Sequence, residues 1–330
     1  MYIRPAEWSS PKEIWLGWPY DKSLWQHNLS LAQSEVLSLI KALSKEKVRL
    51  VVPNEEEIHK ISAHVSSQVQ FEVLDYADIW LRDTFPICVK DEHKKYSLVV
   101  PRFNGWGEKY LFESDRDLSK RVVDRKQLDA HFSSVVFEGG AIECDGEGTM
   151  LTTEQCLLNP NRNPSLTKTH IENEFARLFG VKKVIWLKQG LKNDHTDGHI
   201  DTIARFVAPA TVAIMVPQKG DPNAHVMETI KKQLESEVDA LGRPLKLLEI
   251  PSPGAIIDES GELMPASYLN FIMGDSSFVV PTYASEHDAE AIECFNNFID
   301  CEVVGVSARA ILSGGGAFHC MSQEFYLEAV

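Results

Sequence analysis

The chain of 330 residues has no apolar run of the length that crosses a membrane. Nowhere do about eighteen apolar residues follow one another, and Met1 to Trp8 contain no apolar segment of signal-peptide length. Proline, glycine and serine are scattered along the chain and form no linker. We therefore expect one domain over residues 1–330, a cytoplasmic location and no membrane contact.

Cysteines are also few, and no two of the six are spaced as CxxC. Such sparse thiols do not form a disulfide scaffold, so we expect reduced thiols, five structural and one reactive. Basic residues are in deficit: 33 lysines and arginines face 48 acidic residues, which gives a formal net charge of −15. This balance argues against nucleic acid as a partner and favours a cationic ligand.

What the chain does contain is a run of three glycines followed closely by a single thiol. The segment reads Ser313-Gly314-Gly315-Gly316-Ala317-Phe318-His319-Cys320. Glycine has no Cβ, so such a run lets a reacting group approach a sulfur that other side chains would shield. Most cysteines are small buried apolar residues. In this setting Cys320 is instead a candidate nucleophile, because a cationic neighbour or substrate would favour its thiolate.

Apolar periodicity predicts alternating helices and short strands, which is typical of an α/β protein. One face of the first helix carries Leu29, Ala32, Val36, Ile40 and Leu43. Further helices are expected over 55–65, 166–179, 223–241 and 288–300, and strands over 48–52, 69–74 and 181–187. Gly180 stands where a helix C-terminal cap belongs.

An internal echo suggests repeated modules. Residues 139–144 match residues 315–320 in four of six positions. Junctions where a strand-like segment meets polar residues recur at intervals of roughly 45 to 70 residues. They are Trp80 to Asp83, Glu138 to Gly140, Gly198 to Asp201, Tyr268 to Asn270 and Gly314 to Cys320. Five such modules predict a closed ring in which these junctions converge on one axis.

The junctions carry one thiol, one imidazole and three carboxylates: Cys320, His199, Asp83, Asp201 and Glu138. Carboxylates aimed at a reacting carbon oppose an oxyanion and favour a cation. Guanidinium is planar, permanently charged and bound by carboxylates through paired hydrogen bonds, so Asp83 and Asp201 would hold it with its carbon facing Cys320. His199 would protonate the departing ammonia and then deprotonate a water, with Glu138 on its other ring nitrogen.

Each of these residues has a plainer interpretation. Asp83 follows Arg82 and could be half of a surface ion pair. His199 and Asp201 stand on alternate positions of an expected strand and could hold a metal. Against a metal, His319 would project to the strand face opposite Cys320. A propeller that binds a ligand without turnover is a further alternative.

A series of longer motifs spans nearly the whole chain. They are Pro5-Ala6-Glu7, Trp18-Pro19, Trp80-Leu81-Arg82-Asp83, Phe103-Asn104-Gly105-Trp106-Gly107, Glu138-Gly139-Gly140, Asp145-Gly146-Glu147-Gly148-Thr149, Leu151-Thr152-Thr153-Glu154, Cys156-Leu157-Leu158-Asn159, Asn161-Arg162-Asn163-Pro164, Thr196-Asp197-Gly198-His199-Ile200-Asp201, Ser267-Tyr268-Leu269-Asn270-Phe271, Gly314-Gly315-Gly316 and His319-Cys320. Together and in this order they resemble the agmatine deiminase family, which also contains a bacterial peptidylarginine deiminase branch.

The resemblance implies a five-bladed α/β propeller, or pentein, of pseudo-fivefold ββαβ modules, forming a single guanidino-group-modifying domain over 1–330. It implies no metal, no cofactor and a covalent amidino-cysteine intermediate. The matching motifs give the catalytic residues the roles stated above: Cys320, His199, Asp83, Asp201 and Glu138. Residues expected beside the substrate are Trp80, Asp83, Asp201, Asp194 and Trp106.

The chain departs from the family pattern in several places. Phe85 precedes Pro86 where glycine is frequent, and Ala317 and Phe318 stand where asparagine and isoleucine are common. His195 occupies a position that is often acidic and close to the far amine of the substrate. We expect Asp194 to compensate for that change.

The activity implied is hydrolysis of agmatine to N-carbamoylputrescine and ammonia, in polyamine (putrescine) biosynthesis. Deimination of peptidylarginine or free arginine is the alternative, and it calls for a basic residue beside the substrate carboxylate, with Arg102 and Arg162 as candidates. Amidino transfer to an acceptor amine would use similar chemistry. The expected partners are the small guanidino cation and a second copy of the chain in a homodimer.

Overall fold

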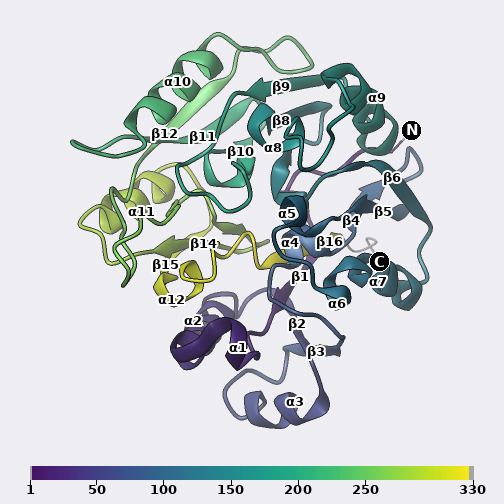
Figure 1. Cartoon of the computed structure of the whole chain (residues 1–330), viewed down its shortest axis with the longest axis vertical. Helices are drawn as coiled ribbons and strands as arrows, with labels where there is room; N and C mark the ends of the chain where they lie inside the picture. Colours follow the sequence, from purple (N-terminus) through teal and green to yellow (C-terminus); the bar gives the residue numbers. More distant parts are fainter. Residues whose placement is uncertain (1, 327–330) are drawn as a thin grey trace.

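Five small sheets surround a common centre in the computed structural model, which describes residues 2–326 (Figure 1). One sheet has the order β16-β1-β2-β3, and each of the others has three strands. The strands are β1 (Lys12–Gly17), β2 (Lys47–Val52), β3 (Gln70–Val73), β4 (Ile87–Lys90), β5 (Tyr96–Arg102), β6 (Ala130–Val136), β7 (Ile142–Cys144), β8 (Thr149–Thr153), β9 (Lys183–Leu187), β10 (Ala204–Ala208), β11 (Thr211–Val216), β12 (Lys246–Pro251), β13 (Ile272–Met273), β14 (Ser277–Thr282), β15 (Glu302–Ser307) and β16 (Ser322–Tyr326).

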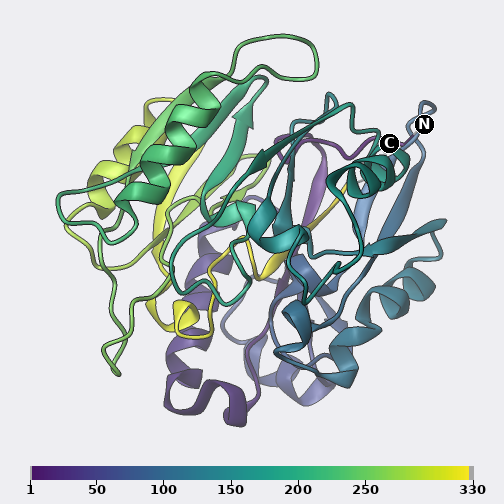
Figure 2. The ribbon, with the colours of Figure 1, turned by 45° about the horizontal axis from the view of Figure 1, so that its top comes forward.

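Four of the sheets are built in the same way. An antiparallel pair of strands is followed by a helix and by a third strand parallel to the second, as in β4-β5-β6, β7-β8-β9, β10-β11-β12 and β13-β14-β15. The intervening helices are α7 (Leu118–Lys126), α9 (Lys168–Phe179), α10 (Ala224–Glu235) and α11 (Asp288–Asn296). These helices lie on the outside of the ring (Figures 1 and 2). The ββαβ modules expected from the family resemblance are thus confirmed.

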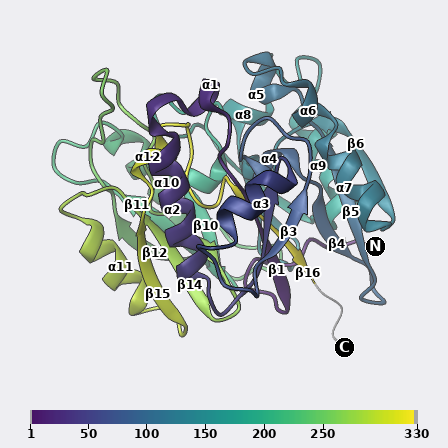
Figure 3. The ribbon, with the colours of Figure 1, turned by 90° about the horizontal axis from the view of Figure 1, so that it is seen from below.

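The fifth module joins the two ends of the chain. β16 pairs antiparallel with β1, so that Lys12 lies opposite Tyr326 and Leu16 opposite Ser322. Helix α2 (Leu29–Ala42) then leads to β2, which runs parallel to β1. The C-terminal strand completes the module that the N-terminal segment begins, and the two lie side by side in Figure 3. This pairing closes the ring, as the sequence predicts.

The remaining helices are short and belong to the connections between strands. They are α1 (Lys22–Trp25), α3 (Glu55–Ile61), α4 (Leu81–Thr84), α5 (Gly105–Glu108), α6 (Glu113–Arg116), α8 (Glu154–Leu157) and α12 (Arg309–Leu312), with 3-10 turns η1 (Gln26–Asn28), η2 (Gly139–Ala141) and η3 (Ile200–Thr202).

The expected helices are present, and several end earlier than the apolar pattern predicts. In α2 the predicted face is buried. In α9 the side chain of Thr167 caps the first turn and Gly180 ends the helix with a left-handed φ of 66°. The helix expected over 223–241 ends at Glu235, because the following residues form a turn in which Asp239 accepts hydrogen bonds from the backbone N–H groups of Leu241 and Arg243.

Apolar side chains fill the space between the sheets and the outer helices. The largest fully buried ones include Trp15, Phe137, Phe175, Phe206 and Phe271. Within residues 2–326, no helix has both the length and the apolar character that a membrane crossing would demand.

Candidate active site

In every module, the turn that leads into the first strand carries a polar side chain. Asp83 precedes β4, Glu138 precedes β7, His199 and Asp201 precede β10, Asn270 precedes β13, and Cys320 precedes β16. The turns meet around Gly140, where an added Cβ would lie 2.6 Å from His199 Nδ1 and 3.1 Å from Asp83 Oδ1. The junctions that the sequence analysis singled out therefore converge, and glycine at position 140 makes room for them.

Cys320 is buried between an acid and an amide. Its Sγ lies 3.5 Å from Asp201 Oδ2 and accepts a hydrogen bond from Asn270 Nδ2 at 3.1 Å. The backbone N–H of Cys320 donates to Asn270 Oδ1, also at 3.1 Å. Burial raises the pKa of the Cys320 thiol well above its ordinary value, and the charges of Asp201 and Asp83 raise it further. The resting site therefore holds a thiol, and a cation that offset the two acids would favour the thiolate.

The two acids differ in how their oxygens are used. Asp83 accepts hydrogen bonds from the backbone N–H of Gly140 at 3.0 Å and from Trp106 Nε1 at 2.8 Å. Asp201 Oδ2 lies 2.7 Å from His319 Nδ1, whereas its buried Oδ1 has no hydrogen-bond partner among the described residues. A buried oxygen without a partner is costly. Asp201 Oδ1 is therefore the place where a ligand that donates hydrogen bonds would be accommodated.

The two acids also titrate differently. Burial raises the pKa of Asp83, and the charges of Asp201 and Glu138 act in the same direction although His199 opposes them. Burial would raise the pKa of Asp201 too, but the hydrogen bond and charge of His319 outweigh it and lower the pKa. Asp201 is thus the acid that stays ionised most readily.

His199 is buried between two carboxylates without a hydrogen bond to either. Its Nε2 lies 3.6 Å from Glu138 Oε2, and its Nδ1 lies 3.9 Å from Asp83 Oδ1. Burial would lower its pKa, but the charge of Asp83 and the contact with Glu138 outweigh burial and raise the pKa well above the ordinary value. Neither ring nitrogen has a hydrogen-bond partner within residues 2–326. A charged imidazole with unused N–H groups is suited to protonate a leaving group.

Glu138, expected beside His199, is also held from its other side. Arg162 Nε lies 2.9 and 3.0 Å from its two oxygens. Burial opposes ionisation of Glu138, yet Arg162 and His199 lower its pKa. Glu138 is therefore ionised and lies close enough to His199 to stabilise the imidazolium.

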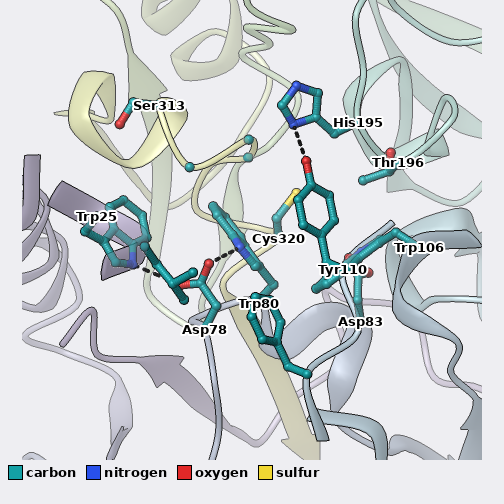
Figure 4. A pocket seen from close by; sticks show the side chains of 15 residues that line it. Trp25, Asp78, Trp80, Asp83, Trp106, Tyr110, His195, Thr196, Ser313 and Cys320 are labelled. Atoms are coloured by element: carbon teal, nitrogen blue, oxygen red, sulfur yellow. Dashed lines mark hydrogen bonds between the residues drawn. The ribbon is translucent and has the colours of Figure 1, made fainter. Parts of the chain in front are cut away.

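Two tryptophans and the glycine run form one side of a cavity of about 220 Å³ above Cys320 (Figure 4). A Cβ on Gly314 would lie 2.8 Å from Trp25 and 2.9 Å from Trp80, and one on Gly316 would lie 2.8 Å from Trp80. The indole Nε1 atoms of Trp25 and Trp80 both donate to Asp78, at 2.9 and 2.8 Å. The run is thus glycine because two indoles, as well as the nucleophile, lie against its backbone.

The other side of the cavity is formed where two loops meet. Trp106 and Tyr110 belong to one loop and His195 to the other, and Tyr110 Oη lies 3.4 Å from His195 Nδ1 (Figure 4). Lys109 Nζ joins the loops as well, because it donates to the carbonyl of His195 at 2.7 Å and to Asp197 Oδ1 at 2.6 Å. The expected aromatic residues Trp80 and Trp106 both line the cavity.

Three sequence interpretations need correction. Asp83 is 2% exposed and is no surface ion pair, since Arg82 instead pairs with Glu324 at 2.8 Å. The 3-10 turn η3 begins directly after His199 and contains Asp201. The two residues are therefore not alternate residues of a strand. His319 and Cys320 also lie in a turn and contact the same oxygen, Asp201 Oδ2. Turns replace strands here because each side chain must reach the centre of the ring from the end of a module.

Of the expected substrate contacts, Trp80, Asp83 and Trp106 line the cavity, whereas Asp201 and Asp194 are not part of its lining. Asp201 contacts the Cys320 sulfur at 3.5 Å. Next to Asp194, it is His195 and Thr196 that line the cavity among the described residues. Asp194 Oδ1 accepts from the backbone N–H of Thr196 at 2.8 Å, and its Oδ2 accepts from that of His199 at 3.2 Å. Its carboxylate therefore shapes the turn that carries His199.

The sequence analysis did not assign roles to Asn270, Asp78 or His319. Asn270 lies on one of the five junctions, and this position could have indicated that it belongs to the active site. Asp78 is two residues before Trp80, but nothing in the sequence brings Trp25 to the same carboxylate. His319 adjoins the nucleophile, and its contact with Asp201 depends on the ring closing.

Among residues 2–326, side chains that could ligate a metal gather in two separate sets. One is Glu138, Cys156 and His199, and the other is Glu7, Glu143 and His319. Each set already has a guanidinium as counterion. Arg162 binds Glu138, and Arg205 pairs with Glu7 and with Glu143, the latter at 3.1 Å. Neither set needs a metal ion to balance its charge.

Known proteins resemble this chain over nearly its whole length. The family model for Porphyromonas-type peptidyl-arginine deiminase matches residues 3–325. A putative agmatine deiminase of Vibrio parahaemolyticus is 32% identical, over 97% of this chain and 95% of its own length. The agmatine deiminase of Stutzerimonas stutzeri is also 32% identical, over 98% of this chain and 95% of its own.

A solved structure of the agmatine deiminase of Enterococcus faecalis superposes with a TM-score of 0.91 at 28% identity, covering 98% of this chain and 95% of that one. The match therefore extends over sequence and fold together. The chain belongs to the agmatine deiminase family, whose named relatives it matches over nearly its whole length, and it also matches the Porphyromonas-type peptidyl-arginine deiminase model.

Proposed function

We propose that this protein is a hydrolase that converts agmatine to N-carbamoylputrescine and ammonia. The observation that carries the proposal is a thiol, two acids and an imidazole gathered at one cavity. Cys320 and Asp83 line the cavity, Asp201 lies 3.5 Å from the Cys320 sulfur, and His199 lies 3.9 Å from Asp83. Among the described residues, Oδ1 of Asp201 has no hydrogen-bond partner. Relatives and a solved structure bearing the name agmatine deiminase support the same substrate.

Binding comes first. The guanidinium of agmatine donates N–H groups to Asp83 and to the unpartnered Oδ1 of Asp201. Its plane then presents the central carbon to Cys320, and the indole of Trp80 lies beside it. The bound cation offsets the acid charges that raise the pKa of Cys320, so the thiol releases its proton to solvent as the substrate binds. The substrate thereby takes part in activating the nucleophile.

The first chemical step expels ammonia. The thiolate forms a bond to the guanidinium carbon, which gives a neutral tetrahedral adduct. His199, charged because of Asp83 and Glu138, gives its proton to one amino group. The carbon–nitrogen bond breaks, ammonia leaves, and a cationic thiouronium remains on Cys320.

The second step consumes water. Neutral His199 removes a proton from a water molecule while the water oxygen bonds to the thiouronium carbon. The carbon–sulfur bond then breaks, and the new hydroxyl gives its proton to the departing sulfur, so that Cys320 is a thiol again. The product carries a ureido group, and His199 is charged again for the next turnover.

The cavity lining favours agmatine over substrates with a carboxylate. Among the described residues that line it there is no lysine or arginine. Arg162, one of the two basic candidates named from the sequence, is bound by Glu138 and Asp197, and Arg102, the other candidate, is exposed at the end of β5. With its guanidinium at Asp83, free arginine would therefore find no cation in the described lining for its carboxylate, and the remaining charged group there is the acid Asp78.

The test is turnover by purified protein, with ammonia and ureido product measured for agmatine, arginine and an arginyl peptide. We expect agmatine to be preferred and Cys320→Ala to abolish its turnover. Cys294→Ala is the matched control, because that thiol is half-buried and outside the cavity lining. Inactive wild type, undiminished turnover in Cys320→Ala, or preference for arginine would overturn the proposal.

The wider setting is part of the proposal. The product would supply putrescine in polyamine biosynthesis, in the cytoplasm, which the six free cysteines support. A homodimer is the assembly we propose, and light scattering of the purified protein tests it.

A further inference from the structure

Directly beside the nucleophile, His319 connects the active site with the N-terminal segment. Its Nδ1 lies 2.7 Å from Asp201 Oδ2, and its Nε2 lies 2.7 Å from Glu7 Oε1. The residue is 1% exposed. Its carbonyl accepts hydrogen bonds from Arg82 Nε at 3.3 Å and from Ser322 Oγ at 3.0 Å. Both the ring and the backbone of His319 are thus held in place.

The carboxylates of Asp201 and Glu7 determine how many protons the imidazole of His319 carries. A neutral imidazole has one N–H donor and one acceptor nitrogen. With ionised oxygens at both nitrogens, the two contacts are favourable together only when both nitrogens carry hydrogen. The contacts of His319 therefore correspond to an imidazolium.

The charges of the surrounding network agree with this count. Below the active site, three buried carboxylates and three buried guanidinium groups form ion pairs with one another; they are Glu7, Glu143, Glu324, Arg4, Arg82 and Arg205. These six charges balance. A charged His319 then balances Asp201, whereas a neutral ring would leave that buried acid without a full partner.

We propose that His319 is a positioning residue for this reaction, which keeps Asp201 ionised and fixes its Oδ2, so that Oδ1 remains free for the guanidinium. The inference rests on the proposed function, because it assigns Asp201 Oδ1 to the substrate. Two observations carry it: the 2.7 Å contact at Oδ2 and the unpartnered, buried Oδ1. Without the contact at Oδ2, the carboxylate could turn toward Cys320 or take up a proton, and substrate binding would weaken.

A pair of amide substitutions separates the two contacts of the ring. The amide nitrogen of an asparagine falls where Nδ1 lies, so His319→Asn keeps a donor toward Asp201 and loses the one toward Glu7. The amide nitrogen of a glutamine falls where Nε2 lies, so His319→Gln does the reverse. Both variants remove the same charge, and each serves as the control for the other.

We expect the difference to lie in substrate binding. The KM for agmatine should rise about 10-fold or more in His319→Gln relative to His319→Asn, with kcat changed much less, since a buried hydrogen bond to a charged group is worth about that factor. A merely structural role would lower the thermal stability and activity of both variants together. Equal KM values in the two variants, with active wild type, would overturn the inference alone. Inactive wild type would overturn the proposed function instead.

A measurement on the wild type covers the case in which neither variant folds. Nitrogen-15 NMR of histidine-labelled protein should show two rings with slowly exchanging N–H protons on both nitrogens. One is His199, and the other is His319, because both of its nitrogens are buried against carboxylates. A spectrum with only one such ring would contradict the assignment.

Discussion

At the scale of single residues, the acids of the site act on the nucleophile and on the substrate in opposite ways. Asp83 and Asp201 attract a guanidinium, and the same charges raise the pKa of Cys320. A neutral molecule of the same shape would leave those charges in place and the thiol protonated. The site therefore selects a cation in two ways: a cation forms hydrogen bonds with the acids, and it favours ionisation of the Cys320 thiol.

Asp201→Asn tests this coupling, because it should change activity and thiol reactivity in opposite directions. Loss of the charge lowers the pKa of Cys320, so alkylation by iodoacetamide should become faster at a given pH. Turnover of agmatine should nevertheless fall by about 100-fold or more, since a charged hydrogen-bond partner of the substrate is lost. Labelling rates at Cys294 provide the internal reference. Slower alkylation of Cys320 in the variant would contradict this account.

A second prediction concerns Asp78 and pH. Burial raises the pKa of Asp78 from 3.8 to about 6, although hydrogen bonds from Ile79, Trp25 and Trp80 oppose the shift. As the pH falls through 6, the carboxyl gains a proton and loses both its charge and an acceptor site for an indole. We expect kcat/KM of the wild type to fall about 10-fold relative to Asp78→Asn across this range. A ratio of wild type to variant that is independent of pH would rule out this role.

Protonation of Asp78 should lower kcat/KM but raise the free energy of unfolding. The folded state binds the proton more tightly than the unfolded state, because the folded pKa is the higher one. The free energy of unfolding therefore loses a contribution as the pH rises from about 4 to about 6, and Asp78→Asn should remove that slope. Denaturant titrations of both proteins at several pH values measure it.

At the scale of elements, the chemistry depends on turns packed against each other. Gly316 belongs to the turn before β16, and an added Cβ would lie 2.8 Å from Trp80 and 2.9 Å from Cys320 Cβ. We expect Gly316→Ala to lower kcat/KM by about 100-fold, because a displaced nucleophile loses its alignment, at a cost in stability of about 1–3 kcal/mol.

Gly242→Ala is the control for that substitution. Gly242 has a φ of +81° and no atom within 4 Å of an added Cβ. Backbone strain there should lower the thermal midpoint slightly and leave agmatine kinetics unchanged. Comparable kinetic losses in the two variants would mean that general destabilisation, and not the position of the sulfur, is responsible.

These turns also show which features the sequence could predict. The junctions carrying Asp83, Glu138, His199, Asp201 and Cys320 stood out by residue type and by spacing, and the helices by their apolar faces. The sequence could not predict that Asp201 lies in a 3-10 turn that begins just after His199, or that Trp25 reaches Asp78. Such contacts join different modules, so they depend on how the ring closes and not on any local pattern.

At the scale of the whole molecule, the strand that follows the nucleophile also closes the ring. Cys320 stands two residues before the start of β16, and β16 pairs with β1 near the other end of the chain. The position of the sulfur therefore depends on a contact between residues about as far apart as the chain allows. Folding and assembly of the active site are coupled through this one strand.

Phe325 in β16 provides the test of that coupling. Its ring is 4% exposed, and its centre lies 5.1 Å from that of Trp15 in β1 and 6.4 Å from that of Phe85. Removal of a buried phenylalanine ring costs about 3–5 kcal/mol, so Phe325→Ala should lower the denaturant midpoint strongly. β16 both closes the circle of five modules and fixes the position of Cys320. Activity and far-UV circular dichroism should therefore be lost at the same denaturant concentration. Phe132→Ala, at a side chain that is 57% exposed, should change neither. If activity were lost well before the secondary structure in Phe325→Ala, the active site would be able to come apart while the ring stays closed.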